Sequence, residues 1–163
     1  MLAARPEARR RIRVRMCGPF DVHYENRAVA LGLKGIVAFE GPVGHDAARE
    51  AQREAALLLL WKPRHGATMV PGKTYEYLDA GRPILALLAA DDEAAALVVR
   101  AGGSVVDPAD RAAIAAAIGA RYDAWKAGAP TPVARPPWLD EYARPALAGR
   151  LASVLDDLVQ SRA

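Results

Sequence analysis

Short runs of apolar residues alternate along the chain with stretches in which apolar residues recur at helical spacing. The runs predict β-strands at residues 12–17, 35–39, 56–61, 83–88 and 104–106. The periodic stretches predict helices at residues 24–31, 46–53, 72–80 and 91–101, and from Asp107 or Asp110 to Lys126. This alternation predicts an α/β fold, a Rossmann-like doubly wound parallel sheet of about five strands with flanking helices.

The C-terminal part of the chain has a different pattern. Residues 128–137 contain Pro130, Pro132, Pro136 and Pro137 and are predicted to form a linker, because proline excludes regular structure. The last segment, residues 138–163, is predicted to form one long amphipathic helix over residues 138–160. One face of that helix carries Leu147, Leu151, Val154, Leu155 and Leu158. In a one-domain protein this helix would pack on the sheet, and in a two-domain protein it would return toward a partner domain.

Composition narrows the class of protein. A chain of 163 residues with 52% hydrophobic and 25% charged residues can bury one core, which excludes a disordered protein. Cys17 is the only cysteine, so the chain cannot form an internal disulfide. No apolar run is long enough for a membrane span, and no signal peptide is visible. We therefore expect a soluble, cytoplasmic protein.

Much of the net charge of +3 lies near the N-terminus, at Arg5, Arg9, Arg10, Arg11, Arg13 and Arg15. Such a run could contact anionic lipid or nucleic acid. Its simpler interpretation is a solvated helix end followed by the outward face of a strand, with Ile12 and Val14 pointing inward. No aromatic residues interleave with the arginines to stack on bases, so we predict no nucleic-acid partner.

In open α/β sheets, ligands bind beyond the carboxyl ends of the strands. The most unusual loop there is residues 62–73, whose basic residues are Lys62, Arg64, His65 and Lys73. It brings Gly72, Lys73 and Thr74 to a helix start, where free amides and a lysine would hold a diphosphate. The alternative is a basic surface loop without a ligand.

The same segment also resembles a P-loop, with Asp91 and Asp92 in the place of the acidic residues that hold magnesium. A P-loop has four residues between its first glycine and the Gly-Lys pair, whereas five lie between Gly66 and Gly72 here. Pro71 also removes one amide from the cradle. A P-loop-like nucleotide hydrolase is therefore the alternative rather than the main hypothesis.

Residues 71–85, P-G-K-T-Y-E-Y-L-D-A-G-R-P-I-L, resemble a known signature. They are similar to the P-x-K-x-x-E-Y-L-x-x-G-x-P-I-L segment in the C-terminal, nucleotide-sugar-binding domain of GT-B glycosyltransferases of the group 1, family 4-like type. Residues 37–45 are similar to the V-x-F-x-G-x-V-x-H turn of the same domain. The resemblance covers roughly residues 11–126.

The resemblance implies a role for each residue of the motif. Glu76 would accept hydrogen bonds from the ribose hydroxyls, and the backbone at Val43 and Gly44 would frame the base. The diphosphate would meet Lys73 and the amides of Gly72 and Thr74, with Arg64 as a further contact. Neither a metal nor a cofactor is implied, and the catalytic residues stay unknown. Many members carry a further glutamate where this sequence has Thr68, so the stereochemical outcome stays open.

By the same resemblance, residues 1–127 form a donor-binding domain that lacks its first strand, and the acceptor-binding N-terminal domain is absent. The implied function is transfer of a sugar from a nucleotide-diphosphate sugar to a glycan or lipid acceptor in polysaccharide biosynthesis. The full-length enzyme could contact a membrane peripherally, and this chain alone would be inactive. A non-catalytic interaction domain of the same fold is the remaining alternative.

Overall fold

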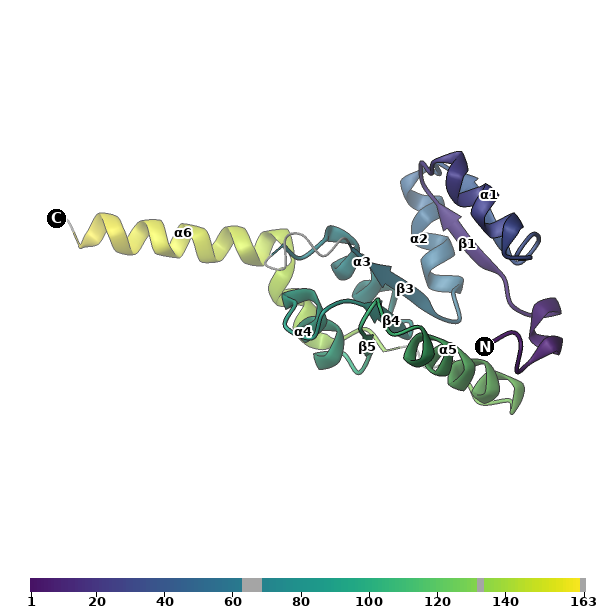
Figure 1. The fold of residues 1–163 in the computed structure, drawn as a ribbon. Helices are drawn as coiled ribbons and strands as arrows, with labels where there is room; N and C mark the ends of the chain where they lie inside the picture. Colours follow the sequence, from purple (N-terminus) through teal and green to yellow (C-terminus); the bar gives the residue numbers. More distant parts are fainter. Residues whose placement is uncertain (63–68, 132–133, 162–163) are drawn as a thin grey trace.

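The computed structural model describes residues 1–62, 69–131 and 134–161. It confirms the α/β class, because strands and helices alternate along most of the chain (Figure 1). With η marking a 3-10 helix, the elements are η1 (Pro6–Arg10), β1 (Val14–Cys17), α1 (Val22–Ala30), β2 (Val37–Gly41), α2 (His45–Glu54), β3 (Leu58–Trp61), α3 (Gly72–Ala80), β4 (Ile84–Leu87), α4 (Glu93–Arg100), β5 (Ser104–Val106), α5 (Arg111–Lys126), η2 (Pro137–Tyr142) and α6 (Arg144–Gln160).

The strands form two parallel sheets, so the prediction of a single sheet of about five strands is wrong. β1 pairs with β2, and β3, β4 and β5 pair in that order. Within the described residues, β3 pairs along one edge only, and its outward side chains Leu59 and Trp61 are 42% and 60% exposed. The continuous apolar run at residues 56–61 therefore belongs here to an edge strand, because hydrophobicity alone does not determine which strands pair.

Aspartate side chains determine where several helices begin. Asp21, Asp92 and Asp110 each precede a helix and accept a hydrogen bond from one of its first amides. Asp110 rather than Asp107 is thus the cap of α5. Asp46, the first residue of the predicted helix at 46–53, is not a cap: α2 begins one residue earlier, at His45, and its N-cap is Gly44, which has no side chain to accept a hydrogen bond.

The hydrophobic core lies around the three-stranded sheet. Leu58, Leu60, Ile84 and Ala86 from β3 and β4 pack with side chains from α3, α4 and η2. The helical contribution comes from Leu78, Ala94, Ala95, Val98 and Leu139. Strand β1, by contrast, contains no fully buried residue. Most of the apolar burial therefore supports the half of the fold that carries α3.

The predicted single helix over residues 138–160 is divided in two. η2 ends at Tyr142, Ala143 is extended with ψ of 142°, and α6 begins at Arg144. Pro145 explains the break, because it has no N–H for the carbonyl of Glu141 and its ring would clash with that carbonyl in a continuous helix. η2 remains on the body through Leu139, whereas α6 extends away from the rest of the molecule and carries the C-terminus at its far end (Figure 1).

Candidate functional site

Helix α3 carries four of the predicted site residues, and its bounds agree with the predicted range of 72–80. Extended backbone at Pro71 precedes it, and Gly81 ends it in the left-handed conformation with φ of +67°. Thr74 and Leu78, one turn apart, are buried. Gly72, Lys73 and Glu76 are exposed. The helix therefore presents a lysine and a carboxylate to solvent at its N-terminal end.

The amides at the start of α3 differ in their availability. The amide of Thr74 donates to the carbonyl of Pro71 at 2.9 Å, so this amide is already engaged and does not fit the phosphate contact expected of it. Among the described residues, no acceptor is found for the amides of Gly72 and Lys73. These two N–H groups lie at the positive end of the helix dipole, where an anion is favoured. The backbone can thus offer two donors beside the Lys73 ammonium group.

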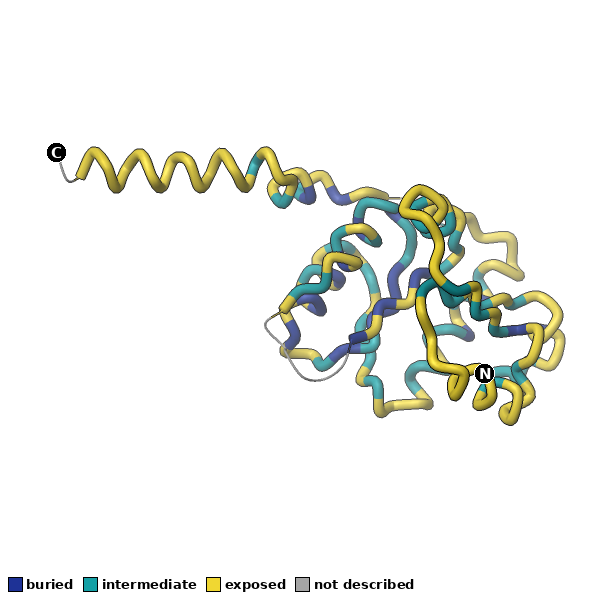
Figure 2. Tube along the Cα trace, turned by 90° about the horizontal axis from the view of Figure 1, so that it is seen from above, coloured by how far each residue is buried: buried dark blue, intermediate teal, exposed yellow. Residues whose placement is uncertain are grey.

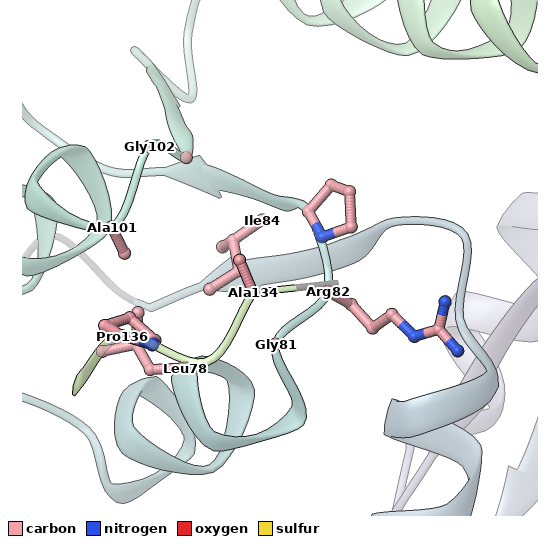
Figure 3. Close-up of a pocket in the computed structure, with 10 residues that line it drawn as sticks. Leu78, Gly81, Arg82, Ile84, Ala101, Gly102, Ala134 and Pro136 are labelled. Carbon is pink, nitrogen blue, oxygen red and sulfur yellow. The ribbon is translucent and has the colours of Figure 1, made fainter. Parts of the chain in front are cut away.

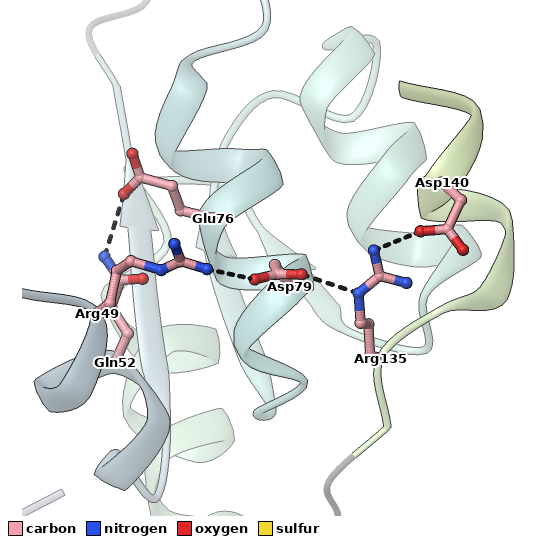
Figure 4. A network of polar contacts seen from close by, with 6 residues as sticks. All are labelled: Arg49, Gln52, Glu76, Asp79, Arg135 and Asp140. Carbon is pink, nitrogen blue, oxygen red and sulfur yellow. Dashed lines mark hydrogen bonds and ion pairs between the residues drawn. The ribbon is translucent and has the colours of Figure 1, made fainter. Parts of the chain in front are cut away.

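Glu76 is positioned by helix α2. The side-chain amide of Gln52 donates to Oε2 of Glu76 at 3.1 Å. One turn earlier in α2, Arg49 forms an ion pair with Asp79 of α3, with 3.1 Å between Nη2 and Oδ2 (Figure 4). The contact with Gln52 holds Oε2 of Glu76 against α2 and leaves Oε1 without a partner among the described residues.

The ion-pair network continues from α3 to the proline-rich segment. Arg135 Nε lies 2.8 Å from Asp79 Oδ1, and Arg135 Nη2 lies 2.6 Å from Asp140 Oδ1 (Figure 4). The hydrogen bond and charge of Arg135, together with the charge of Arg49, lower the pKa of Asp79 below its usual value despite partial burial. Asp79 thereby links α3 to both α2 and η2.

Cys17 and Glu40 lie close to this region, although they were not among the predicted site residues. The Cys17 thiol, at the end of β1, is 3.6 Å from the Glu40 carboxylate, which Arg15 also holds at 2.8 Å. The pKa of the Cys17 thiol is raised, mainly by burial and to a smaller extent by the neighbouring Glu40 carboxylate. The positive charges of Arg15 and Lys73 act in the opposite direction. Both residues lie at the carboxyl ends of parallel strands, where ligands bind in open α/β sheets, so their position at strand ends was the signal for them.

The expected cluster of basic residues around the loop at 62–73 is only partly formed. Lys62 is 7% exposed, and its ammonium group pairs with Asp92 at 2.7 Å and donates to the carbonyl of Met69 at 2.8 Å. Lys62 therefore belongs to a buried ion pair and is not exposed to a ligand. Arg64 and His65 lie outside the described residues. Lys73 is the described basic residue that remains exposed at the start of α3.

Val43 and Gly44 lie between the end of β2 and the first turn of α2. Gly44 precedes the helix with ψ of 156°, and its carbonyl accepts from the amide of Ala48 at 2.9 Å. Among the described residues, no hydrogen bond joins Val43 or Gly44 to α3. The contacts between α2 and α3 involve Arg49 and Gln52 instead. Arg49 contacts Asp79 in the last turn of α3, and Gln52 contacts Glu76 one turn earlier in α3.

A small pocket lies at the opposite end of the strands. It has a volume of about 120 Å³ and is bordered by the starts of β4 and β5, the end of α3 and the proline-rich segment (Figure 3). Leu78, Ile84, Ala101, Ala134 and Pro136 contribute to its mainly apolar lining, and the side chain of Arg82 points away from it. This pocket is at the amino ends of the strands, so it does not coincide with the site on α3.

The fold and the site together define an α/β protein with parallel strands and an exposed lysine–glutamate pair at a helix start. Comparisons of the chain with protein-family models, with curated proteins and with solved structures give no match. Across the described ranges, no helix is both long and apolar enough to cross a membrane. The same ranges contain no group of three or more His, Cys, Asp or Glu side chains placed to hold a metal ion.

Proposed function

We propose that this chain binds the nucleotide-diphosphate part of a sugar donor and serves as the donor domain of a cytoplasmic GT-B-type glycosyltransferase. The observation that carries the proposal is the N-terminal end of α3. There the exposed Lys73, two amides without an acceptor among the described residues, and Glu76 lie within about one turn of helix. This arrangement offers donors to phosphate oxygens and an acceptor to sugar hydroxyls on one exposed surface.

Each group has a distinct part in the proposed chemistry. Lys73 and the amides of Gly72 and Lys73 would neutralise the diphosphate, on which negative charge develops as the bond to the sugar breaks. The carboxylate of Glu76, held on one side by Gln52, would accept hydrogen bonds from the ribose hydroxyls through its other oxygen. The bound species is thus a nucleoside diphosphate, recognised at both its ribose and its phosphates.

The P-loop-like hydrolase is less well supported. Asp92, its candidate magnesium ligand, is 5% exposed, and both of its carboxylate oxygens have partners. Oδ2 pairs with Lys62 at 2.7 Å, and Oδ1 accepts the amide of Ala94 at 2.9 Å as the cap of α4. A metal at Asp92 would have to displace a buried ammonium group and a helix cap, which is costly.

We further propose that the donor domain is completed by a strand that pairs with β3. The edge of β3 that has no partner strand among the described residues supports this, because an open strand edge favours pairing with another strand. Transfer of the sugar to a glycan or lipid acceptor would require an acceptor-binding domain in addition to this chain. The chain alone is therefore expected to bind the donor without turning it over.

Calorimetric titration with nucleoside diphosphates and with the matching nucleosides tests the proposal. One diphosphate should bind without added metal. Lys73→Ala should weaken the diphosphate roughly 10- to 100-fold, as expected for a lost charged hydrogen bond, and should leave nucleoside binding unchanged. Glu76→Gln should weaken both by a similar factor and should reduce the preference for ribose over 2′-deoxyribose.

Two matched substitutions serve as controls. Lys34→Ala removes an exposed lysine before β2, and Glu50→Gln neutralises an exposed glutamate on α2. Both should bind the nucleotide as the unmodified chain does. Absence of binding for every diphosphate would contradict the donor-site proposal and would favour an interaction domain. Binding of a triphosphate only with magnesium would favour the hydrolase.

A further inference from the structure

Helix α6 carries an exposed row of apolar side chains, which we call the apolar stripe. It consists of Leu147, Leu151, Val154 and Leu158, which are 46%, 60%, 54% and 53% exposed. Apart from Ala146, every described side chain of α6 is exposed, and the helix projects from the body without another element beside it (Figures 1 and 2). Such a continuous apolar row on a projecting helix is typical of a contact surface.

The spacing of the apolar stripe is that of a helix–helix seam. Its members follow one another at intervals of four, three and four residues, which places them at alternating a and d positions of a heptad. Leu155 widens the stripe on one side. Ala148, at an e position, lies beside it and would allow a second helix to approach closely.

Charge is distributed unevenly along the same helix. Arg144 and Arg150 lie in its first half, and Asp156 and Asp157 lie in its second half. In the heptad defined by the stripe, Arg150 and Asp157 both occupy g positions, which border the seam. Two such helices in opposite directions bring the g position of one beside the g position of the other. The basic half of each helix would then face the acidic half of the other.

We propose that α6 pairs with α6 of a second copy of this chain in an antiparallel two-helix contact. In this arrangement Leu151 lies opposite Val154 of the second copy, and Leu147 lies opposite Leu158. Arg150 lies beside Asp157 of the second copy, and the two-fold symmetry produces this pair twice. A parallel arrangement would instead place Arg144, an a position, against Arg144 of the other copy in the seam. Charge therefore selects the antiparallel direction.

The contact is small, and this determines its strength. A helix of 17 residues is about 25 Å long, so the pair buries less than the roughly 1,600 Å² of a standard interface. Since α6 projects from one end, an antiparallel pair holds the two bodies at opposite ends of the contact, where they do not collide. We expect a reversible dimer whose fraction depends on protein concentration in the micromolar range.

Sedimentation velocity over a range of concentrations tests the pairing. The unmodified chain should shift from monomer to dimer as its concentration rises. Leu151→Asp puts a charge into the seam of both copies and should weaken dimerisation about 100-fold or more. Val159→Asp is the matched control, since Val159 is 70% exposed on the same helix but lies off the stripe, and it should dimerise as the unmodified chain does. Circular dichroism checks that both variants fold.

Charge exchange tests the antiparallel direction. Arg150→Asp and Asp157→Arg should each weaken self-association about 10-fold, since each places like charges side by side twice. A mixture of the two variants should form a heterodimer as readily as the unmodified chain dimerises. Arg150 also donates a hydrogen bond to the carbonyl of Glu141. Arg150→Asp loses this bond and Asp157→Arg keeps it, and mixing the two variants does not restore it. Recovery of association in the mixture therefore reports the charge pairs between copies and not this bond.

Three results would overturn the proposal. The first is an unmodified chain that stays monomeric at every concentration, in which case another partner covers the stripe. The second is equal behaviour of Leu151→Asp and Val159→Asp, which would place any dimer contact elsewhere. The third is a mixture of the two charge variants that associates no better than either variant alone, which would exclude the antiparallel pairing.

Discussion

The buried ion pair between Lys62 and Asp92 leads to a sharp prediction about stability. Lys62 follows β3, Asp92 caps α4, and the ammonium and carboxylate groups are 2.7 Å apart with exposed fractions of 7% and 5%. Lys62→Met keeps most of the side-chain volume and removes the charge. The carboxylate of Asp92 then stays buried without its cation. We predict that this single substitution destabilises the fold severely.

The magnitude follows from the cost of leaving one charge unpaired. Removing one partner of a buried pair typically costs about 3–5 kcal/mol, whereas replacing both partners is often close to neutral. Lys62 also donates to the carbonyl of Met69 at 2.8 Å, and losing that bond adds about 1 kcal/mol. Since a domain of this kind has a total stability of roughly 5–15 kcal/mol, Lys62→Met removes a large part of it.

Urea unfolding of Lys62→Met, Asp92→Asn and the double variant measures the coupling between the two residues. Asp92→Asn retains a side-chain oxygen for the Ala94 amide, so it tests the charge rather than the cap. The double variant should be more stable than the sum of the single losses predicts. Lys126→Met is the control, because the ion pair of Lys126 with Glu7 is exposed and should contribute little to stability. A loss below about 1 kcal/mol for Lys62→Met would refute the reasoning.

Two further predictions concern the end of α3. Gly81→Ala should destabilise the fold by about 1–3 kcal/mol in thermal unfolding, since Gly81 has φ of +67° and a Cβ there would lie 3.1 Å from the backbone nitrogen of Arg135. Gly128 also has a positive φ, +79°, but an added Cβ there would meet no atom within 4 Å, so Gly128→Ala should cost only the backbone strain. Equal losses of stability in Gly81→Ala and Gly128→Ala would contradict the packing argument. Asp79→Asn should cost about 1 kcal/mol near neutral pH. Because Arg135 lowers the pKa of Asp79 in the folded chain, this contribution is present above the ordinary aspartate pKa of about 3.9 and is lost as pH falls through the lower folded value. A stability difference between Asp79→Asn and the unmodified chain that does not shrink as pH falls below about 3.9 would exclude this explanation.

The sequence was most informative where the backbone carries its own signals. Helix α3 has the predicted bounds because Pro71 does not continue an upstream helix and Gly81 readily adopts the left-handed conformation that ends one. β5 likewise has the predicted bounds, after Gly102 and Gly103. The grouping of Gly72, Lys73, Thr74 and Glu76 followed directly, because residues this close on one helix cannot be far apart in space.

Relations between distant segments were not predictable in this way. An apolar run predicts a strand, but it does not specify the neighbour of that strand, so one sheet was expected where two formed. Lys62 was expected among the basic residues of the candidate ligand loop, because nothing local shows that Asp92 lies 2.7 Å away. The same limit applies to Cys17 and Glu40, which are brought together by pairing between β1 and β2.

The division into two sheets gives the helix contacts a particular importance. Since no strand pairing joins β2 to β3 within the described residues, side-chain contacts connect the two halves. The segment before β1 contacts α5 through Arg5 with Asp123 and Glu7 with Lys126. Nearer the site, α2 contacts α3 through Gln52 with Glu76 and Arg49 with Asp79. These side chains are partly exposed, and contacts of this type contribute only about 0–1 kcal/mol each. The orientation of Glu76 relative to β1 and β2 therefore depends on weak interactions. A nucleotide that contacts both Glu76 and the loop before α2 would bridge the two halves, so binding should also stabilise their relative position.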